Sequence, residues 1–159
     1  MGNPFAGVEK AQVARGGVYF LPGTYKVEVK SVKLKQSRKK DDLLIIETLV
    51  LESDNADRPA GSCPSQVINF KHDAALGNVK AFVAAGLGLD ATKDEAEVNA
   101  QVTGDLCNQV CSDDQPFAGL VLNLSAVNIE TREGNEFTIH NWSPSPELLA
   151  ELAKVKGAA

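Results

Sequence analysis

The chain has 159 residues, of which 43% are hydrophobic and 23% charged, and its formal net charge is −5. This length and composition predict one folded domain with a real core rather than a disordered chain. No apolar run approaches the roughly 20 residues that a membrane helix needs, and the N-terminus lacks the basic and apolar regions of a secretory signal. We therefore expect a cytoplasmic protein, in the host cytoplasm if the chain is viral, with no membrane partner.

The beginning of the chain shows no regular pattern. Residues 1–17 contain Gly, Pro and polar residues without a clear period, and they predict a flexible N-terminal arm. Order is expected to begin near "VYFLPGTY", because Pro22 and Gly23 form a turn signal in front of a strand.

The first expected strand, "TYKVEVKSVKLK", changes its parity near Ser31. Its apolar residues occupy odd positions up to Val29 and even positions from Val32 onward. A change of parity within a strand predicts a β-bulge or sharp bend, which lets a sheet curl toward a barrel. The change also predicts that the lysines of the strand are divided between its two faces, Lys26 and Lys30 on one and Lys33 and Lys35 on the other.

Two more strands are expected next. The segment "QSRKKDD" predicts a polar hairpin loop. The segment "LLIIETLVLES" is apolar on both faces, which places its strand centrally in a sheet. After the loop "DNADRPAGSCP", the segment "SQVINFK" predicts a third, weaker strand.

The period becomes helical from Asp73. Apolar residues then recur at three- and four-residue spacing and predict the buried stripe of a helix that ends at "GLGLD": Leu76, Val79, Val83 and Leu87. In "TKDE", Thr92 and Glu95 predict the capping box of a second helix. The inner stripe of that helix is expected to contain Val98, Val102 and Leu106.

The segment "QPFAGLVLNLSAVNIETREGNEFTIHNWSP" predicts a β-hairpin, with a strand to about Ile129 and a turn at Gly134-Asn135. Residues 147–159 predict a short C-terminal helix or a mobile tail. Three strands, a helical insertion and two strands are also the order of the five-stranded OB barrel. We therefore expect a mainly β domain over residues 18–146, built as a five-stranded OB-fold-like barrel with a helical insertion.

Cations are concentrated between Lys26 and Lys40, a segment with seven of the chain's 16 basic residues and one acid, Glu28. The rest of the chain therefore has nine basic and 20 acidic residues. A basic patch on an acidic body favours binding of a phosphate backbone through counterion release. The alternative is that these lysines guard an edge strand against pairing with other sheets. The hairpin loop favours the first interpretation, because OB barrels grip ligands with this loop.

Aromatic side chains near the predicted groove are candidates for stacking on bases, which is worth about 1–3 kcal/mol per base. The strongest candidates are Phe70, beside Lys71, and Trp142. The sequence contains none of the common phosphate-loop, zinc-protease or serine-nucleophile motifs, so we expect neither catalysis nor a cofactor. Three cysteines, an odd number, predict free thiols rather than disulfides or a metal site.

Four segments carry a resemblance to a known family: "GTYKVEVKSVKLK", "LLIIETLVLES", "HDAALGNVKAFVAAGLG" and "GLVLNLSAVNIETREGNEFTIHNWSP". Over about residues 20–146 they resemble the short OB-fold single-stranded-DNA-binding proteins of tailed bacteriophages. The resemblance implies an accessory protein of phage DNA replication or recombination that coats single strands without chemistry. The groove that it implies is lined by basic residues: Lys26, Lys30, Lys33, Lys35 and Lys71, with Arg38, Lys39 and Lys40 on the hairpin loop and Arg132 on the later hairpin.

The leading hypothesis is therefore sequence-tolerant binding of single-stranded DNA, with RNA as an alternative ligand. Replication or recombination proteins are further expected partners, and a homo-oligomer is left open. Two alternatives stay open as well. A β-rich structural or protein-interaction module of a virus would use the lysines only to protect an edge strand, and a small inhibitor would use its acidic surface to mimic DNA.

Overall fold

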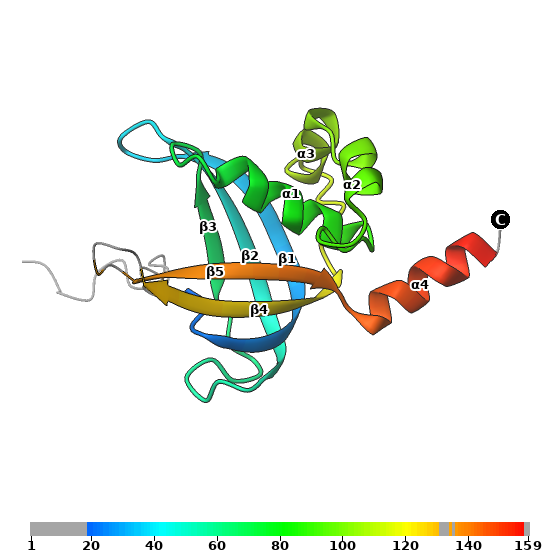
Figure 1. Ribbon diagram of the computed structural model, residues 1–159, viewed down its shortest axis with the longest axis horizontal. Helices are drawn as coiled ribbons and strands as arrows, with labels where there is room; N and C mark the ends of the chain where they lie inside the picture. Colours follow the sequence, from blue (N-terminus) through cyan, green and yellow to red (C-terminus); the bar gives the residue numbers. More distant parts are fainter. Residues whose placement is uncertain (1–18, 131–133, 135, 158–159) are drawn as a thin grey trace, which may run out of the picture.

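The structure is a computed structural model that describes residues 19–130, 134 and 136–157 (Figure 1). The predicted order of three strands, a helical insertion and two strands is confirmed. The expected N-terminal arm, residues 1–17, lies outside the described residues. The elements are β1 (Gly23–Gln36), β2 (Asp42–Ser53), β3 (Ser65–Asn69), α1 (Ala75–Gly86), α2 (Glu95–Gln101), α3 (Gly104–Val110), β4 (Val121–Glu130), β5 (Glu136–Pro144) and α4 (Pro146–Gly157).

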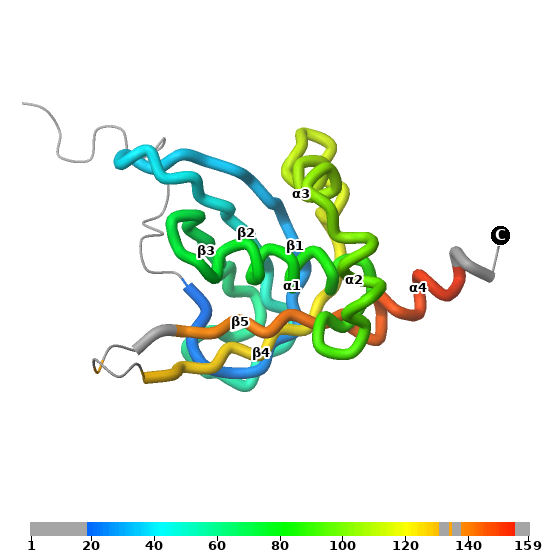
Figure 2. Tube along the Cα trace, turned by 45° about the horizontal axis from the view of Figure 1, so that its top comes forward, coloured from blue at the N-terminus to red at the C-terminus, as the bar shows by residue number. Residues whose placement is uncertain are grey.

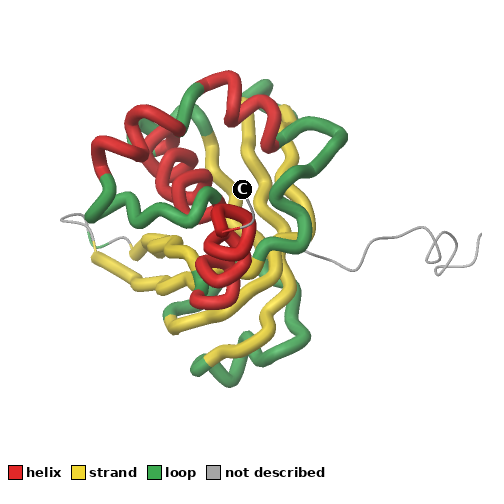
Figure 3. The backbone as a smooth tube through the Cα atoms, turned by 90° about the vertical axis from the view of Figure 1, so that its right-hand side faces the viewer, coloured by secondary structure: helices red, strands yellow, loops and turns green. Residues whose placement is uncertain are grey.

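The strands form one antiparallel sheet in the order β3-β2-β1-β4-β5. The predicted mainly β class is therefore confirmed. The sheet is strongly curved, and helices α1, α2 and α3 gather on one side of it (Figure 3). Its hydrogen-bonded ladder is open between β3 and β5. Within the described residues, no helix is long and apolar enough to cross a membrane.

A buried side-chain contact links the two edge strands where the ladder is open. The indole N–H of Trp142 on β5 donates a hydrogen bond of 2.7 Å to Oε1 of Gln66 on β3. Phe20 packs its ring edge against Trp142, with centroids 6.1 Å apart, and also contacts Tyr25 on β1. Aromatic packing and one side-chain bond thus bring together edges that the backbone does not join.

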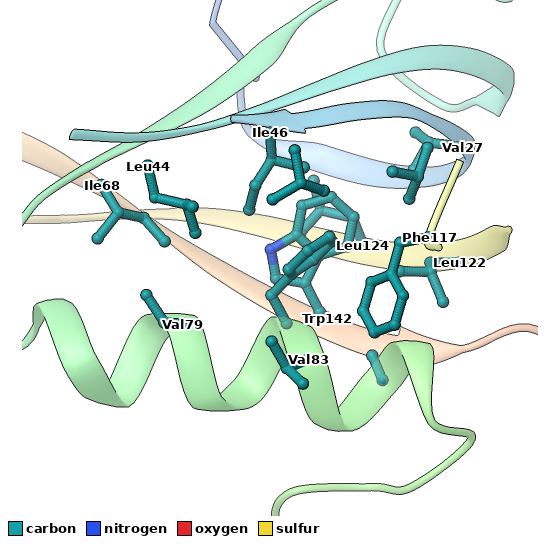
Figure 4. Close-up of a cluster of buried hydrophobic side chains, with 14 of the residues drawn as sticks. Val27, Leu44, Ile46, Ile68, Val79, Val83, Phe117, Leu122, Leu124 and Trp142 are labelled. Atoms are coloured by element: carbon teal, nitrogen blue, oxygen red, sulfur yellow. The ribbon is translucent and has the colours of Figure 1, made fainter. Parts of the chain in front are cut away.

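The core lies between the concave face of the sheet and helix α1. Figure 4 shows Val79 and Val83 of α1 pointing toward the sheet, with Trp142 between Val83 and Ile46. The predicted helix stripe is therefore confirmed at Val79 and Val83. Leu76 is 71% exposed, so its prediction is wrong. Phe82, fully buried, takes the largest share of this helix's apolar burial, and burying such a side chain contributes about 1.5–3 kcal/mol.

The second predicted helix is in fact two short helices. The chain breaks at Val102, which is extended, and α3 begins after Thr103, whose hydroxyl accepts a hydrogen bond from the N–H of Leu106. The predicted capping box is also wrong, because the Thr92 hydroxyl donates to the carboxylate of Asp90 instead. Asp and Thr side chains readily form such local turns in competition with helix caps.

Candidate nucleic-acid interface

The basic strand β1 contains the bulge that its change of parity predicted. Its register with β2 shifts between Val29 and Ser31, so that Lys30 has no Cα partner on β2. Val29 before the bulge and Val32 after it are both fully buried, which means that the inserted residue restores the buried face. The prediction that the lysines divide between two faces is therefore wrong. Three of them extend from the same outer face of the sheet: Lys26, Lys33 and Lys35.

Acidic side chains neutralise the first half of this basic strand. Nζ of Lys26 lies 2.7 Å from Oε1 of Glu147 on α4 and 3.3 Å from Oε2 of Glu52 on β2. The hydrogen bond with Glu147 is the main reason that the pKa of Lys26 is raised, and the same bond lowers the pKa of Glu147. Lys30 is likewise bonded to Glu28 at 2.6 Å. Neither lysine presents an unpaired charge to a ligand.

The second half of the strand and its hairpin hold cations without carboxylate partners. Five basic residues are exposed and make no ion pair with any described residue: Lys33, Lys35, Arg38, Lys39 and Lys40. The turn is fixed by hydrogen bonds from Ser37 N to Asp41 O at 2.8 Å and from Lys40 N to Ser37 O at 2.9 Å. Lys40 adopts the left-handed conformation, with φ 64°. The cationic surface is therefore the end of the β1–β2 hairpin, not the whole strand.

Lys71 lies next to this hairpin. Its Nζ is 3.9 Å from Oδ2 of Asp41, at the limit of an ion pair. The preceding residue, Phe70, donates its N–H to the carbonyl oxygen of Asp42 at 3.0 Å. This backbone bond fixes the β3–α1 connection against the hairpin and brings Lys71 beside the hairpin cations. Asp41 reduces the attraction of Lys71 for a phosphate.

The two predicted stacking rings do not extend from the outer face. Trp142 is only 6% exposed and its indole N–H is occupied by Gln66, so it is a core residue whose ring face is not open to a base. Its strand alternation places it on the concave side, where Phe20 and Phe82 pack against it. Phe70 is half-buried and lines a cleft between the sheet and helices α1 and α3. Arg132 lies outside the described residues.

Aliphatic side chains accompany the free lysines on the outer face. Lys33 pairs across the sheet with Ile45, which in turn pairs with Val67, a residue that is 38% exposed. Lys35 pairs with Leu43. These aliphatic residues were not predicted as part of the site. The signal that could have identified them is that "LLIIETLVLES" is apolar on both faces, while only one face of this sheet is covered by helices.

A second hollow, of about 760 Å³, is rich in acidic groups, in contrast to the cationic end of the β1–β2 hairpin. It lies around Lys26, and its lining includes the acidic side chains of Glu52, Asp54 and Asp90. Hydrogen bonds from the hydroxyl and N–H of Thr92 lower the pKa of Asp90 and keep it charged. Negative charge repels a phosphate backbone, so a nucleic acid is expected to avoid this region.

Other reactive groups form no site within the described part of the chain. All three cysteines are free thiols, as predicted. Burial raises the pKa of Cys107 and Cys111, which disfavours the reactive thiolate. No group of three or more His, Cys, Asp or Glu side chains among the described residues is placed to hold a metal ion.

No protein-family model matches the chain, and no curated protein matches it significantly in sequence.

Proposed function

We propose that the protein binds single-stranded DNA without strong sequence preference, through the outer face and tip of the β1–β2 hairpin. The observation that carries the proposal is the group of five exposed, unpaired cations between Lys33 and Lys40, on a chain of net charge −5. Charge separation of this kind attracts a phosphate backbone to one surface and repels it elsewhere.

The architecture supports this proposal. Five antiparallel strands in a curved sheet, with a helical insertion after β3, fit a partly open OB-fold-like barrel. In this interpretation the Trp142–Gln66 hydrogen bond and the Phe20 ring close the barrel where β3 and β5 lack a ladder. The hairpin with the free cations is then the loop that OB barrels use to grip oligonucleotides. A role in phage DNA replication or recombination, without catalysis, belongs to the same proposal.

The surface determines the expected mode of binding. Phosphates would contact the lysines and Arg38, while bases would lie over aliphatic groups at Ile45 and Val67. Without an exposed ring among these residues, each base gains less than the 1–3 kcal/mol typical of aromatic stacking. Binding should therefore be dominated by counterion release, with weak discrimination between bases and between DNA and RNA. For single strands the slope of log K against log salt is about −0.7 per phosphate contacted, so five contacts give a slope of about −3.5.

The test is fluorescence anisotropy with labelled oligo-dT in a salt series. We expect binding at low salt that weakens along that slope. Reversal of two hairpin charges in K39E/K40E should abolish most binding, while the matched variant K93E/K154E, which reverses two exposed lysines outside the hairpin, should bind normally. Absence of binding at low salt, or equal affinity for both variants, contradicts the proposal. In that case the structural or protein-interaction module becomes the better interpretation.

A further inference from the structure

β1 has a free edge in its hairpin half, which is the part after Glu28 that leads into the β1–β2 hairpin loop. β4 pairs with β1 only from Gly23 to Glu28. Beyond that point, the chain before β4 makes single contacts with β1, through Gly119 and Leu120 to the backbone of Val29. In Figure 2 the hairpin half of β1 forms the upper margin of the sheet, and β2 lies beside β1 on the side away from this margin. Among the described residues, no strand covers this margin.

The alternation of hydrogen bonds shows which backbone groups face the margin. The N–H and carbonyl of Val32 point away from β2, because both are bonded to the Gln115 side chain, at 2.7 and 2.8 Å. Antiparallel pairing alternates along a strand, so Leu34 and Gln36 direct their backbone groups to the same side. Within the described part of the chain, no hydrogen bond satisfies these groups on that side. The margin is thus a short edge that can accept another strand.

Gln115 already acts as a one-residue substitute for a partner strand. Its side-chain amide accepts from Val32 N and donates to Val32 O, the same pair of bonds that a peptide group of an adjacent strand would make. Its own backbone adopts φ 43°, an uncommon conformation for a residue other than glycine. The amide group of Gln115 therefore marks where a docked strand would end and shows that the edge binds a peptide-like group.

The two faces beside this edge differ in chemistry. On the concave side, Leu34 is 53% exposed and lines a mostly apolar cleft of about 520 Å³ between the sheet and helices α1 and α3. Phe70 and Leu76 line the same cleft, and Leu76 is 71% exposed. On the outer side, Lys33 and Lys35 have no carboxylate partner among the described residues.

We propose that an extended segment of a partner protein adds to β1 at Leu34–Gln36 as an extra strand. Side chains of a strand alternate between faces, so its sequence should alternate apolar residues, which enter the cleft, with acidic residues, which pair with Lys33 and Lys35. A second copy of this chain is a poor occupant of the edge, because pairing two β1 edges places the lysines of both copies together. The inference does not depend on nucleic-acid binding.

The test uses a synthetic peptide of four Val-Glu repeats, with Val-Lys and Ser-Glu repeats of equal length as comparisons. Calorimetry should detect binding of the Val-Glu peptide by the wild-type protein and weaker binding of both comparison peptides. Amide hydrogen exchange by NMR should slow at Leu34 and Gln36 on binding. The charge reversal K33E/K35E should weaken Val-Glu binding by about tenfold and favour the Val-Lys peptide, since each surface charge pair contributes modestly. K93E/K154E should leave Val-Glu binding unchanged.

Two results would overturn the proposal. One is that the wild-type protein does not bind the Val-Glu peptide. The other is binding that is equally strong with K33E/K35E and leaves exchange at Leu34 and Gln36 unaltered, because the peptide would then occupy another surface. Failure of oligo-dT binding would leave the peptide result intact, so the two proposals are tested separately.

Discussion

His140 on β5 should make the stability of the protein depend on pH. Its ring packs edge-on against Phe20, with centroids 5.8 Å apart, beside the contact that joins β3 and β5. The Nε2 atom is buried and has no hydrogen-bond partner among the described residues. Burial lowers the pKa of His140 from 6.5 to about 4, and a hydrogen bond with the Thr138 backbone only partly opposes this effect. The folded protein therefore holds His140 neutral in mildly acidic solution.

The direction of the effect follows from the two pKa values. In the unfolded chain His140 takes up a proton as the pH falls below 6.5, whereas in the folded protein it does so only near pH 4. Unfolding is therefore favoured progressively across this interval, and the loss is complete below it. At about pH 5 the lowered pKa corresponds to a loss of at most about 2 kcal/mol in the free energy of unfolding. Because His140 is only partly buried as a residue, we expect about 1–2 kcal/mol.

The assay is urea unfolding at several pH values between neutral and about pH 4.5, a range set by linkage. Fluorescence of Trp142, the one tryptophan of the chain, reports on the same region. The variant H140F keeps a ring but cannot titrate, so its stability should fall less than that of the wild-type protein over this range. H72F, at an exposed histidine, controls for loss of an ordinary imidazole. If H140F and the wild-type protein lose stability in parallel, a buried neutral His140 is refuted.

Two further predictions concern the core. A Cβ at Gly86 would overlap the ring of Phe117, so G86A should lower the free energy of unfolding by about 1–3 kcal/mol. Gly77 lies in open space on the same helix, so G77A should raise the free energy of unfolding by about 0.5–1 kcal/mol. Urea unfolding of both variants checks this, and equal effects of the two substitutions would contradict the packing. W142F leaves the side chain of Gln66 buried without its donor and should cost at least about 1–3 kcal/mol in thermal or urea unfolding followed by circular dichroism. Its oligo-dT affinity under conditions where it is folded should equal that of the wild-type protein, and a large loss there would restore Trp142 as a stacking residue.

The strand order could be predicted from sequence because each strand carries its own alternation and turn signals. The irregularity at Ser31 was also visible, since apolar residues change parity there. What the sequence pattern did not provide is the consequence of that change for Lys33 and Lys35. The same sequence pattern is expected from a bulge, which keeps the lysines on one face, and from a bend that moves them to the other face. Only the register with β2 distinguishes these two structures.

Contacts between distant segments were the least predictable feature of the site. Lys26 belongs to the basic segment by sequence, yet Glu147, which is 121 positions away, occupies its ammonium group. Likewise, nothing local to Trp142 shows that Gln66 will meet its indole N–H across the open edge of the sheet. Charge counts along a segment therefore give the number of cations but not the number that are available, which depends on how α4 and β2 pack against the strand.

The two proposals place their ligands on the same hairpin, and this has a consequence that can be measured. Lys33 and Lys35 extend from the outer face beside the free edge, so an acidic strand docked at Leu34 would neutralise two of the five cations available to DNA. By the counterion-release relation, removing two phosphate contacts reduces the salt slope of oligo-dT binding by about 1.4. Arg38, Lys39 and Lys40 at the hairpin tip would stay available for DNA. Saturating Val-Glu peptide should therefore weaken oligo-dT binding and make its salt dependence less steep, without abolishing the binding. Complete displacement of oligo-dT by the peptide would show that both ligands require the hairpin tip.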